Sequence, residues 1–145
     1  MEPNKIKICG IKDLSIANFC IESDADYLGF VSYKNSPRDI SFNDSKNIIS
    51  KLSKPINTVA VTVNADINNI KEIEDSGFNY VQLHGSESLD YLSSIKKSTK
   101  LKIIKAFGVS TQSDFDHIGD YIDLCDFFLL DAKPAKSEMP GGNAK

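Results

Sequence analysis

The sequence predicts an α/β fold in which parallel strands alternate with helices. Short apolar, β-branched runs recur along the chain, and segments with apolar residues at helical spacing separate them. Three of the runs, "ADYLGF", "FNYVQL" and "CDFFLL", share an entry pattern in which a small or polar residue precedes an aromatic residue and an apolar run, which indicates a weakly repeated strand–helix unit. The chain has 145 residues, 41% of them hydrophobic, enough to bury a core. We therefore expect a single domain over residues 1–145.

Six strands and five helices are expected, in alternation. The strands are runs rich in β-branched and aromatic residues, at 6–9, 27–31, 58–63, 80–83, 102–106 and 127–131. Apolar residues mark the helical faces between them, at 19–21, 48–52, 67–73, 89–95 and 115–122. Ser41 and Asp44 predict a capping box that opens the second helix, and Gly77 predicts the end of the third. The helical faces should pack onto the sheet.

Two architectures fit this order of elements. Six parallel strands with five helices form either an open, doubly wound sheet or most of a (β/α)8 barrel, and periodicity alone does not separate them. The first strand runs into "CGIKD" and not into GxGxxG. The phosphate-binding fingerprint of a dinucleotide-binding open sheet is therefore missing.

Composition and charge point to a small-molecule partner. The 17 basic and 20 acidic residues are scattered along the chain and give a net charge of -3, so we expect neither a nucleic-acid face nor a membrane-binding patch. The start, "MEPNKIKICG", has no signal-peptide core, and no stretch approaches the roughly 18 apolar residues of a membrane helix. A soluble, cytoplasmic protein is expected. Three cysteines without a CxxC pair argue against a disulfide framework and a zinc site.

Several reactive side chains stand where strands end, which is where parallel α/β folds bind ligands. Cys9 and Asp131 stand out, although a cysteine ending a strand is more often a small buried hydrophobe. A carboxylate after "FFLL" needs a function or a partner, and a helix cap or salt bridge explains it equally well. His84 fits a ligand contact or a structural hydrogen bond, and Arg38, after a Ser-Pro turn, fits a carboxylate or phosphate clamp or a plain surface charge.

Six motifs resemble one known family, in order and with matching gaps. They are "KICGIKD" at 7–13, "DADYLGFV" with "SPR" between 24 and 38, "VAVTVN" at 59–64, "VQLHG" at 81–85, "IKAF" at 104–107, and "LLDAKP" with "PGG" between 129 and 142. The chain resembles phosphoribosylanthranilate isomerase over essentially its whole length.

The resemblance implies a TIM barrel, that is a (β/α)8 barrel, acting in tryptophan biosynthesis. Such an enzyme converts N-(5-phosphoribosyl)anthranilate, a phosphorylated small molecule, by an Amadori rearrangement, without a metal or an organic cofactor. By the resemblance, Cys9 is the general base, Asp131 the general acid, and Arg38 the group that engages the anthranilate carboxylate. The further substrate-binding residues expected are Gln82, His84 and Asn64.

The chemistry suits these residue types. The acid must protonate the ribose ring oxygen as the ring opens to a Schiff base, and an apolar strand end favours a protonated carboxyl. The base must then remove the C2 proton, which requires thiolate character at Cys9 from nearby positive charge or backbone dipoles. The residues alone do not name the activating group.

We expect a truncated member of that family, a three-quarter TIM barrel lacking strands seven and eight. In the family the "PGG" turn leads to the sixth helix and then to those strands. Strands one and six would become open edges, which predicts inward repacking or self-association. The phosphate site of such barrels is built from the loops after strands seven and eight. Losing those contacts would weaken substrate binding at least about a thousandfold, so we expect weak or no activity from this chain alone.

A second interpretation comes from a different class. The chain would then be a non-catalytic barrel subdomain, a scaffold that self-associates or complements a separate C-terminal fragment. The two interpretations differ in whether the isolated chain turns over substrate in a Cys9-dependent way. Another phosphate-handling barrel enzyme is disfavoured by the joint presence of "KICG", "SPR" and "LLD".

Overall fold

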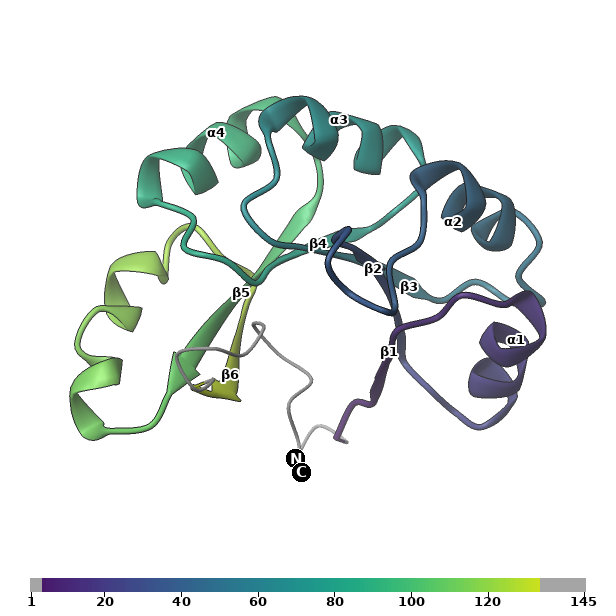
Figure 1. Cartoon of the computed structure of the whole chain (residues 1–145), viewed down its shortest axis with the longest axis horizontal. Helices are drawn as coiled ribbons and strands as arrows, with labels where there is room; N and C mark the ends of the chain where they lie inside the picture. Colours follow the sequence, from purple (N-terminus) through teal and green to yellow (C-terminus); the bar gives the residue numbers. More distant parts are fainter. Residues whose placement is uncertain (1–3, 134–145) are drawn as a thin grey trace.

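The computed structural model describes residues 4–133, which form one curved, six-stranded parallel sheet with helices on its outer face (Figure 1). All six expected strands are confirmed. They are β1 (Lys7–Cys9), β2 (Tyr27–Ser32), β3 (Asn57–Thr62), β4 (Tyr80–Leu83), β5 (Lys102–Val109) and β6 (Phe127–Ala132). The strand order is β1-β2-β3-β4-β5-β6. The "PGG" motif at 140–142 lies outside the described residues.

This topology is that of an incomplete (β/α)8 barrel and not of a doubly wound sheet. Sequence-adjacent strands pair throughout, whereas a doubly wound sheet reverses its strand order and carries helices on both faces. Within residues 4–133, β1 pairs only with β2, and β6 only with β5. The sheet curves so that β1 and β6 both border its open side, opposite the arc of helices (Figure 1). Strands seven and eight are not among the described residues.

Four α-helices connect the first five strands, and each begins at a side-chain cap. They are α1 (Leu14–Glu22), α2 (Phe42–Ile49), α3 (Ile67–Asp75) and α4 (Leu89–Ser98), capped by Asp13, Ser41, Asp66 and Ser88. Of the predicted capping box one half is present: the Ser41 hydroxyl accepts from the Asp44 N–H at 3.1 Å, but the Asp44 carboxylate accepts from the Ser41 hydroxyl, at 2.6 Å, in place of the Ser41 backbone N–H. Gly77, at φ 89°, follows α3 as predicted.

The fifth connection is helical but is not one α-helix. It consists of two 3-10 turns, η1 (Gln112–Phe115) and η2 (Ile118–Tyr121). Asp114 folds back to accept from the N–H groups of Ser110 and Thr111, and Gly119 is the second residue of η2. Aspartate and glycine are poor residues for a helix interior, so local hydrogen bonds win over a continuous helix here.

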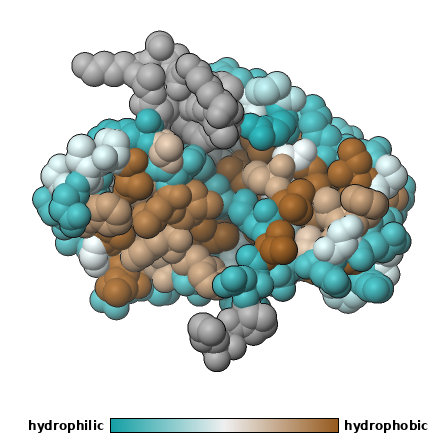
Figure 2. Space-filling model, turned by 90° about the horizontal axis from the view of Figure 1, so that it is seen from below, coloured by the Kyte–Doolittle hydropathy of each residue, from teal (hydrophilic) through white to brown (hydrophobic). Residues whose placement is uncertain are grey.

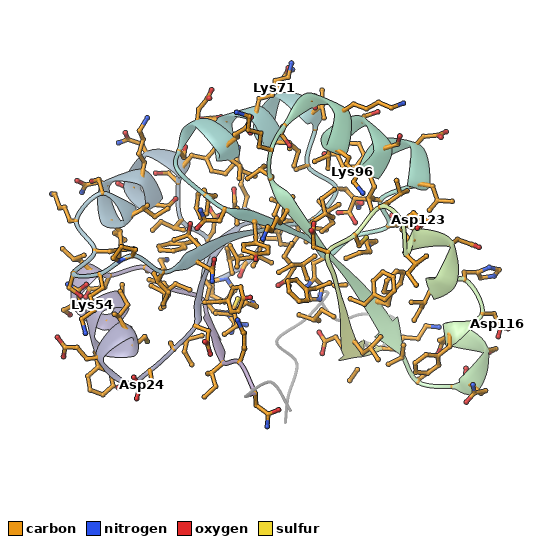
Figure 3. All side chains as sticks on the ribbon, turned by 180° about the vertical axis from the view of Figure 1, so that it is seen from behind. Asp24, Lys54, Lys71, Lys96, Asp116 and Asp123 are labelled. Atoms are coloured by element: carbon orange, nitrogen blue, oxygen red, sulfur yellow. The ribbon has the colours of Figure 1, made fainter. Side chains whose placement is uncertain are left out.

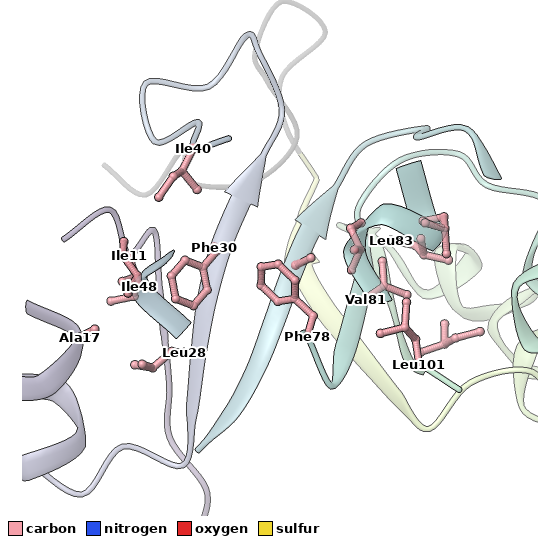
Figure 4. Close-up of a cluster of buried hydrophobic side chains, with 14 of the residues drawn as sticks. Ile11, Ala17, Leu28, Phe30, Ile40, Ile48, Phe78, Val81, Leu83 and Leu101 are labelled. Atoms are coloured by element: carbon pink, nitrogen blue, oxygen red, sulfur yellow. The ribbon is translucent and has the colours of Figure 1, made fainter. Parts of the chain in front are cut away.

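The main core lies between the outer face of the sheet and the helices. Leu28, Phe30, Val81 and Leu83 point outward from the strands into this layer (Figure 4). Phe30 meets Phe78 edge to face, with ring centroids 5.6 Å apart. Charged side chains such as Lys71 lie on the far side of the helices, toward solvent (Figure 3).

A smaller apolar layer covers the inner, concave face of the sheet. Its buried members are Val31, Val59, Val61, Tyr80 and Ile104. A pocket of 480 Å³ lies beside this layer and is lined by residues of β1, β2, β5 and β6. Opposite edges of the sheet therefore border one hollow.

The open edges carry exposed apolar side chains. Phe127, Phe128 and Leu130 of β6 are 48%, 37% and 52% exposed, and Ile6 and Ile8 at β1 are 53% and 39% exposed. Seen from the open side, hydrophobic residues gather in two areas, one on the side of β6 and one on the side of β1 (Figure 2). No helix between residues 4 and 133 has the length and apolarity required to cross a membrane.

Candidate active site

The proposed chemical groups share the inner face of the sheet. Side chains alternate between the two faces of a strand, and residues paired in register lie on the same face. Ile104, which belongs to the inner layer, pairs with Gln82, and Val59 of the same layer pairs with Gly29, which pairs in turn with Cys9. On β6, Asp131 lies two residues beyond Leu129, which packs on the inner layer.

Cys9 ends β1, and its thiol is accessible. The side chain is exposed and packs against the backbone of Gly29 in β2. A Cβ at position 29 would lie 3.0 Å from the Cys9 Sγ and 3.2 Å from its Cα. Only glycine lets β1 approach β2 this closely, so Gly29 allows the Cys9 thiol to lie against β2 at the carboxyl end of β1.

Arg38 lies across the turn that follows Cys9. Gly10 has φ 92°, and a Cβ built there would meet the Arg38 Cδ at 2.6 Å. Hydrogen bonds bend the loop after β2 back toward this turn, since the Tyr33 N–H donates to Asp39 Oδ1 at 2.7 Å. The structure therefore packs the arginine side chain against the turn that directly follows Cys9.

Asp131 meets His84 at the other side of the open barrel. The Asp131 Oδ1 accepts from the N–H of Ala132 at 2.9 Å, and its Oδ2 lies 3.3 Å from the His84 Nε2. The His84 Nδ1 lies 2.9 Å from the Gln82 Nε2. Three of the expected site residues thus lie in one chain of polar contacts.

The imidazole of His84 is poised to be neutral. Burial lowers the pKa of His84, the negative charge of Asp131 opposes that effect, and the positive charges of Lys105 and Lys7 add to it. A neutral imidazole carries one donor and one acceptor nitrogen, which matches its two partners.

Asn64 is held by a different contact. Its backbone is in the left-handed region at φ 49°, its Oδ1 accepts from the Ser86 N–H at 2.9 Å, and its own N–H donates to Glu87 Oε1 at 2.9 Å. These bonds join the loop after β3 to the loop after β4. The structure does not bring Asn64 into the chain of Gln82, His84 and Asp131.

A buried ion pair between Lys105 and Glu87 lies at the same end of the sheet and was not expected from the sequence. The Lys105 Nζ lies 2.9 Å from Glu87 Oε2, and both side chains are almost fully buried. Lys105 also donates to the backbone carbonyls of Leu83, Gly85 and Ala106. A lysine inside the apolar strand of "IKAF" was the only sequence signal for it.

Lys7 is a second site residue that the sequence reasoning did not select. It lies two residues before Cys9, so both side chains share the inner face of β1. Its charge also acts on His84. The period of two in a strand was sufficient to find it, and Lys7 adds a positive charge to the face of β1 that carries Cys9.

The other two cysteines, Cys20 and Cys125, lie in surroundings that do not favour a reactive thiolate. Cys20 is buried in the main core, and burial raises the pKa of Cys125 to about 11, which keeps that thiol protonated. Between residues 4 and 133, no group of three or more histidine, cysteine, aspartate or glutamate side chains is arranged to hold a metal ion.

Comparison with known proteins identifies one family. The family model for N-(5'-phosphoribosyl)anthranilate (PRA) isomerase matches residues 6–142. A protein of Rhizobium meliloti named N-(5'-phosphoribosyl)anthranilate isomerase is 38% identical over 141 residues, which cover 96% of this chain and 66% of the relative. One of Agrobacterium fabrum is 39% identical over 145 residues, covering 99% and 66%. The chain thus spans slightly less than two thirds of the length of these relatives.

Solved structures agree. Phosphoribosyl anthranilate isomerase from Thermotoga maritima superposes with a TM-score of 0.84 at 36% identity, covering 92% of this chain and 64% of that one. A phosphoribosyl anthranilate isomerase in complex with reduced 1-(o-carboxyphenylamino)-1-deoxyribulose 5-phosphate superposes with a TM-score of 0.82 at 36% identity, covering 90% and 66%.

Proposed function

Because the chain belongs to the N-(5'-phosphoribosyl)anthranilate isomerase family, we propose that it carries the acid–base centre for the Amadori rearrangement of N-(5-phosphoribosyl)anthranilate in tryptophan biosynthesis. The observation that carries this proposal is the inner-face placement of Cys9 on one side of the open barrel and Asp131 on the other, with Arg38 packed against the turn after Cys9. A related enzyme of known structure binds a reduced aminodeoxyribulose phosphate, which supports the same ligand class for this chain.

In the proposed mechanism, each of the three residues has its own role. Asp131 gives a proton to the ribose ring oxygen as the C1–O bond breaks, and the nitrogen lone pair forms the C1–N double bond of the Schiff base. Cys9, as thiolate, then takes the C2 proton. The electron pair of the broken C2–H bond forms the C1–C2 double bond of an enolamine, and the π pair of the C1–N bond returns to nitrogen. Return of a proton to C1 and loss of the enol proton give the ketone. Arg38 holds the anthranilate carboxylate through two N–H donors.

The phosphate group has no partner assigned in the described part of the chain. In (β/α)8 barrels the phosphate site is typically formed by the loops after strands seven and eight. The described residues hold six strands, so the acid–base groups and the phosphate groups are separated here. We therefore expect this chain to bind substrate weakly while retaining its proton-transfer groups.

A cytoplasmic location stays a prediction.

Turnover of freshly prepared N-(5-phosphoribosyl)anthranilate by the purified chain tests the proposal. The loss of anthranilate-type fluorescence is followed over a wide substrate range, with the double variant Cys9→Ala, Asp131→Asn as the blank. We expect kcat/KM above the blank, with an elevated KM. A rate equal to that of the blank at every substrate concentration would rule out catalysis by this chain and favour the scaffold interpretation.

We also propose that the open edges mediate self-association. Edge strands present unpaired backbone N–H and C=O groups, and here exposed apolar side chains flank them. β6 of one copy set beside β1 of a second copy continues the sheet in the parallel sense, and Leu130 and Ile8 would both be covered. Such a head-to-tail contact uses two different surfaces of the chain.

Light scattering at several protein concentrations tests self-association. The wild-type mass is expected to rise with concentration, and Leu130→Lys, which puts a charge on the β6 edge, should shift it toward the monomer. Phe19→Lys is the matched control, since Phe19 is 68% exposed on α1 and away from both edges. A wild-type mass fixed at the monomer value would contradict the proposal.

A further inference from the structure

The contact between His84 and Asp131 bridges two strands that are not neighbours. His84 directly follows β4, Asp131 lies in β6, and β5 runs between them. Two strand spacings amount to about 10 Å, so the imidazole has to pass over the inner face of β5. The inward residues of β5 at this level are Ala106 and Gly108, which alternate with Ile104 and pair with Leu129 and Asp131. Small side chains at these two positions leave the path open.

Gln82 defines which nitrogen of His84 carries the proton. Gln82 is only 2% exposed, and its amide nitrogen, 2.9 Å from the His84 Nδ1, can only donate. The His84 Nδ1 is therefore an acceptor, and the single proton of the neutral ring sits on Nε2. That N–H faces the Asp131 Oδ2 at 3.3 Å.

The charges around the ring agree with a neutral form. Asp131 on β6 favours the imidazolium, whereas Lys105 on β5, Lys7 on β1 and burial oppose it. Lys105 is paired with Glu87. Lys102 also belongs to the inner face, where its Nζ lies over the Tyr80 ring, and Lys5 lines the inner pocket together with Lys7, but of these three lysines only Lys7 acts on the pKa of His84.

The buried side-chain oxygen of Gln82 can serve as an acceptor when Asp131 is protonated. Its Oε1 is buried and has no hydrogen-bond partner between residues 4 and 133, a state that costs free energy. When Asp131 carries the proton that it must deliver, its O–H can donate to the His84 Nε2. The ring then holds its one proton on Nδ1, and that N–H needs an acceptor. Rotation of the Gln82 amide by half a turn puts Oε1 there.

We propose that Gln82 and His84 are positioning residues that hold Asp131 in both of its protonation states. With Asp131 ionised, donors run from Gln82 to His84 to Asp131, and with Asp131 protonated, the direction of the chain reverses. On protonation the Nε2–H bond breaks and that proton passes to the Asp131 Oδ2, while one proton from solvent binds Nδ1, so the ring keeps one N–H, on Nε2 in the first state and on Nδ1 in the second. This role rests on the proposed function of Asp131 as the acid, whereas the tautomer itself does not.

Nitrogen NMR of the chain with 15N-labelled histidine tests the proposal directly. The sequence has two histidines, and His117, which is 88% exposed at its side chain, is the internal reference. At neutral pH we expect His84 to show a protonated Nε2 and an unprotonated Nδ1, with a titration midpoint below the ordinary value of 6.5. An imidazolium, or an Nδ1–H tautomer, at neutral pH in the wild type would overturn the proposal.

Variants at position 82 separate the proposed role from plain packing. Gln82→Glu offers only acceptor oxygens to Nδ1, so His84 should move its proton to Nδ1 or become doubly protonated, with its midpoint raised. Gln82→Met has a similar length and no donor, and should give a mixture of tautomers. Gln112→Met, at an exposed position on η1, should leave His84 unchanged. Wild-type behaviour of His84 in both Gln82 variants would overturn the role of Gln82.

Steady-state kinetics of His84→Asn adds the functional readout. A positioning residue acts through Asp131, so kcat should fall with KM nearly unchanged, whereas a residue that only binds substrate would raise KM. A rise in KM alone would overturn the positioning role. A wild-type chain without turnover that still shows the Nε2–H tautomer would count against the proposed function, and it would support the hydrogen-bonded chain.

Discussion

Replacing Glu87 by alanine is expected to lower the free energy of unfolding by about 3–5 kcal/mol, the usual cost of leaving one partner of a buried ion pair alone. Glu87 and Lys105 have side-chain exposures of 2% and 4%, and their charged atoms are 2.9 Å apart. A loss of this size is a large part of the stability of a typical domain.

The backbone contacts of the pair add to this cost. Glu87 Oε1 accepts from the N–H groups of Asn64 and Gly85, so its removal also frees two donors at the rim. A double replacement, Glu87→Leu with Lys105→Met, removes both charges but also removes the bonds that these two donors and three carbonyls make to the pair. We therefore expect the double variant to stay well below the wild type, unlike ion pairs that apolar residues replace without loss.

Urea unfolding followed by circular dichroism measures the effect. Lys133→Ala is the matched control, because it breaks the pair of Lys133 with Asp114, whose lysine is 55% exposed, and it should change the midpoint far less. Equal midpoint shifts for Glu87→Ala and Lys133→Ala would show that burial does not set the value of these pairs in this protein.

The sequence was sufficient for those parts of the fold that depend on local pattern. Period two and helical spacing located all six strands and four helices, because each element buries a face against its immediate neighbours. The fifth connection differed, since the preference of Asp114 and Gly119 for turns overrides a weak apolar period there.

The candidate site, too, could be predicted from the sequence only in part. Cys9, Asp131 and Arg38 were selected from motifs, and the shared inner face of Cys9 and Asp131 follows from strand alternation. The contact between His84 and Asp131 could not be predicted from the sequence, because it depends on the register of three strands and on the small size of Ala106. The partner of Lys105 was equally hidden, since Glu87 lies in a loop whose path only the fold determines.

Removing either proton-transfer group is expected to lower kcat by about 10²–10⁴-fold, the range typical of general acid–base catalysis. Cys9→Ala removes the group proposed to take the C2 proton, and Asp131→Asn removes the group proposed to protonate the ring oxygen. Asparagine keeps the shape of Asp131 and a hydrogen bond to His84. Because the two groups serve successive steps, the double variant should be about as slow as the slower single variant.

Substrate carrying deuterium at C2 assigns the two roles. In Cys9→Ala the removal of the C2 proton becomes the slow step, so the deuterated substrate should react more slowly than the ordinary one. In Asp131→Asn ring opening becomes slow and no bond to C2 hydrogen breaks in that step, so the isotope effect should vanish. Isotope effects in the reverse order would exchange the roles of base and acid. Equal effects in both variants would mean that one residue serves both steps.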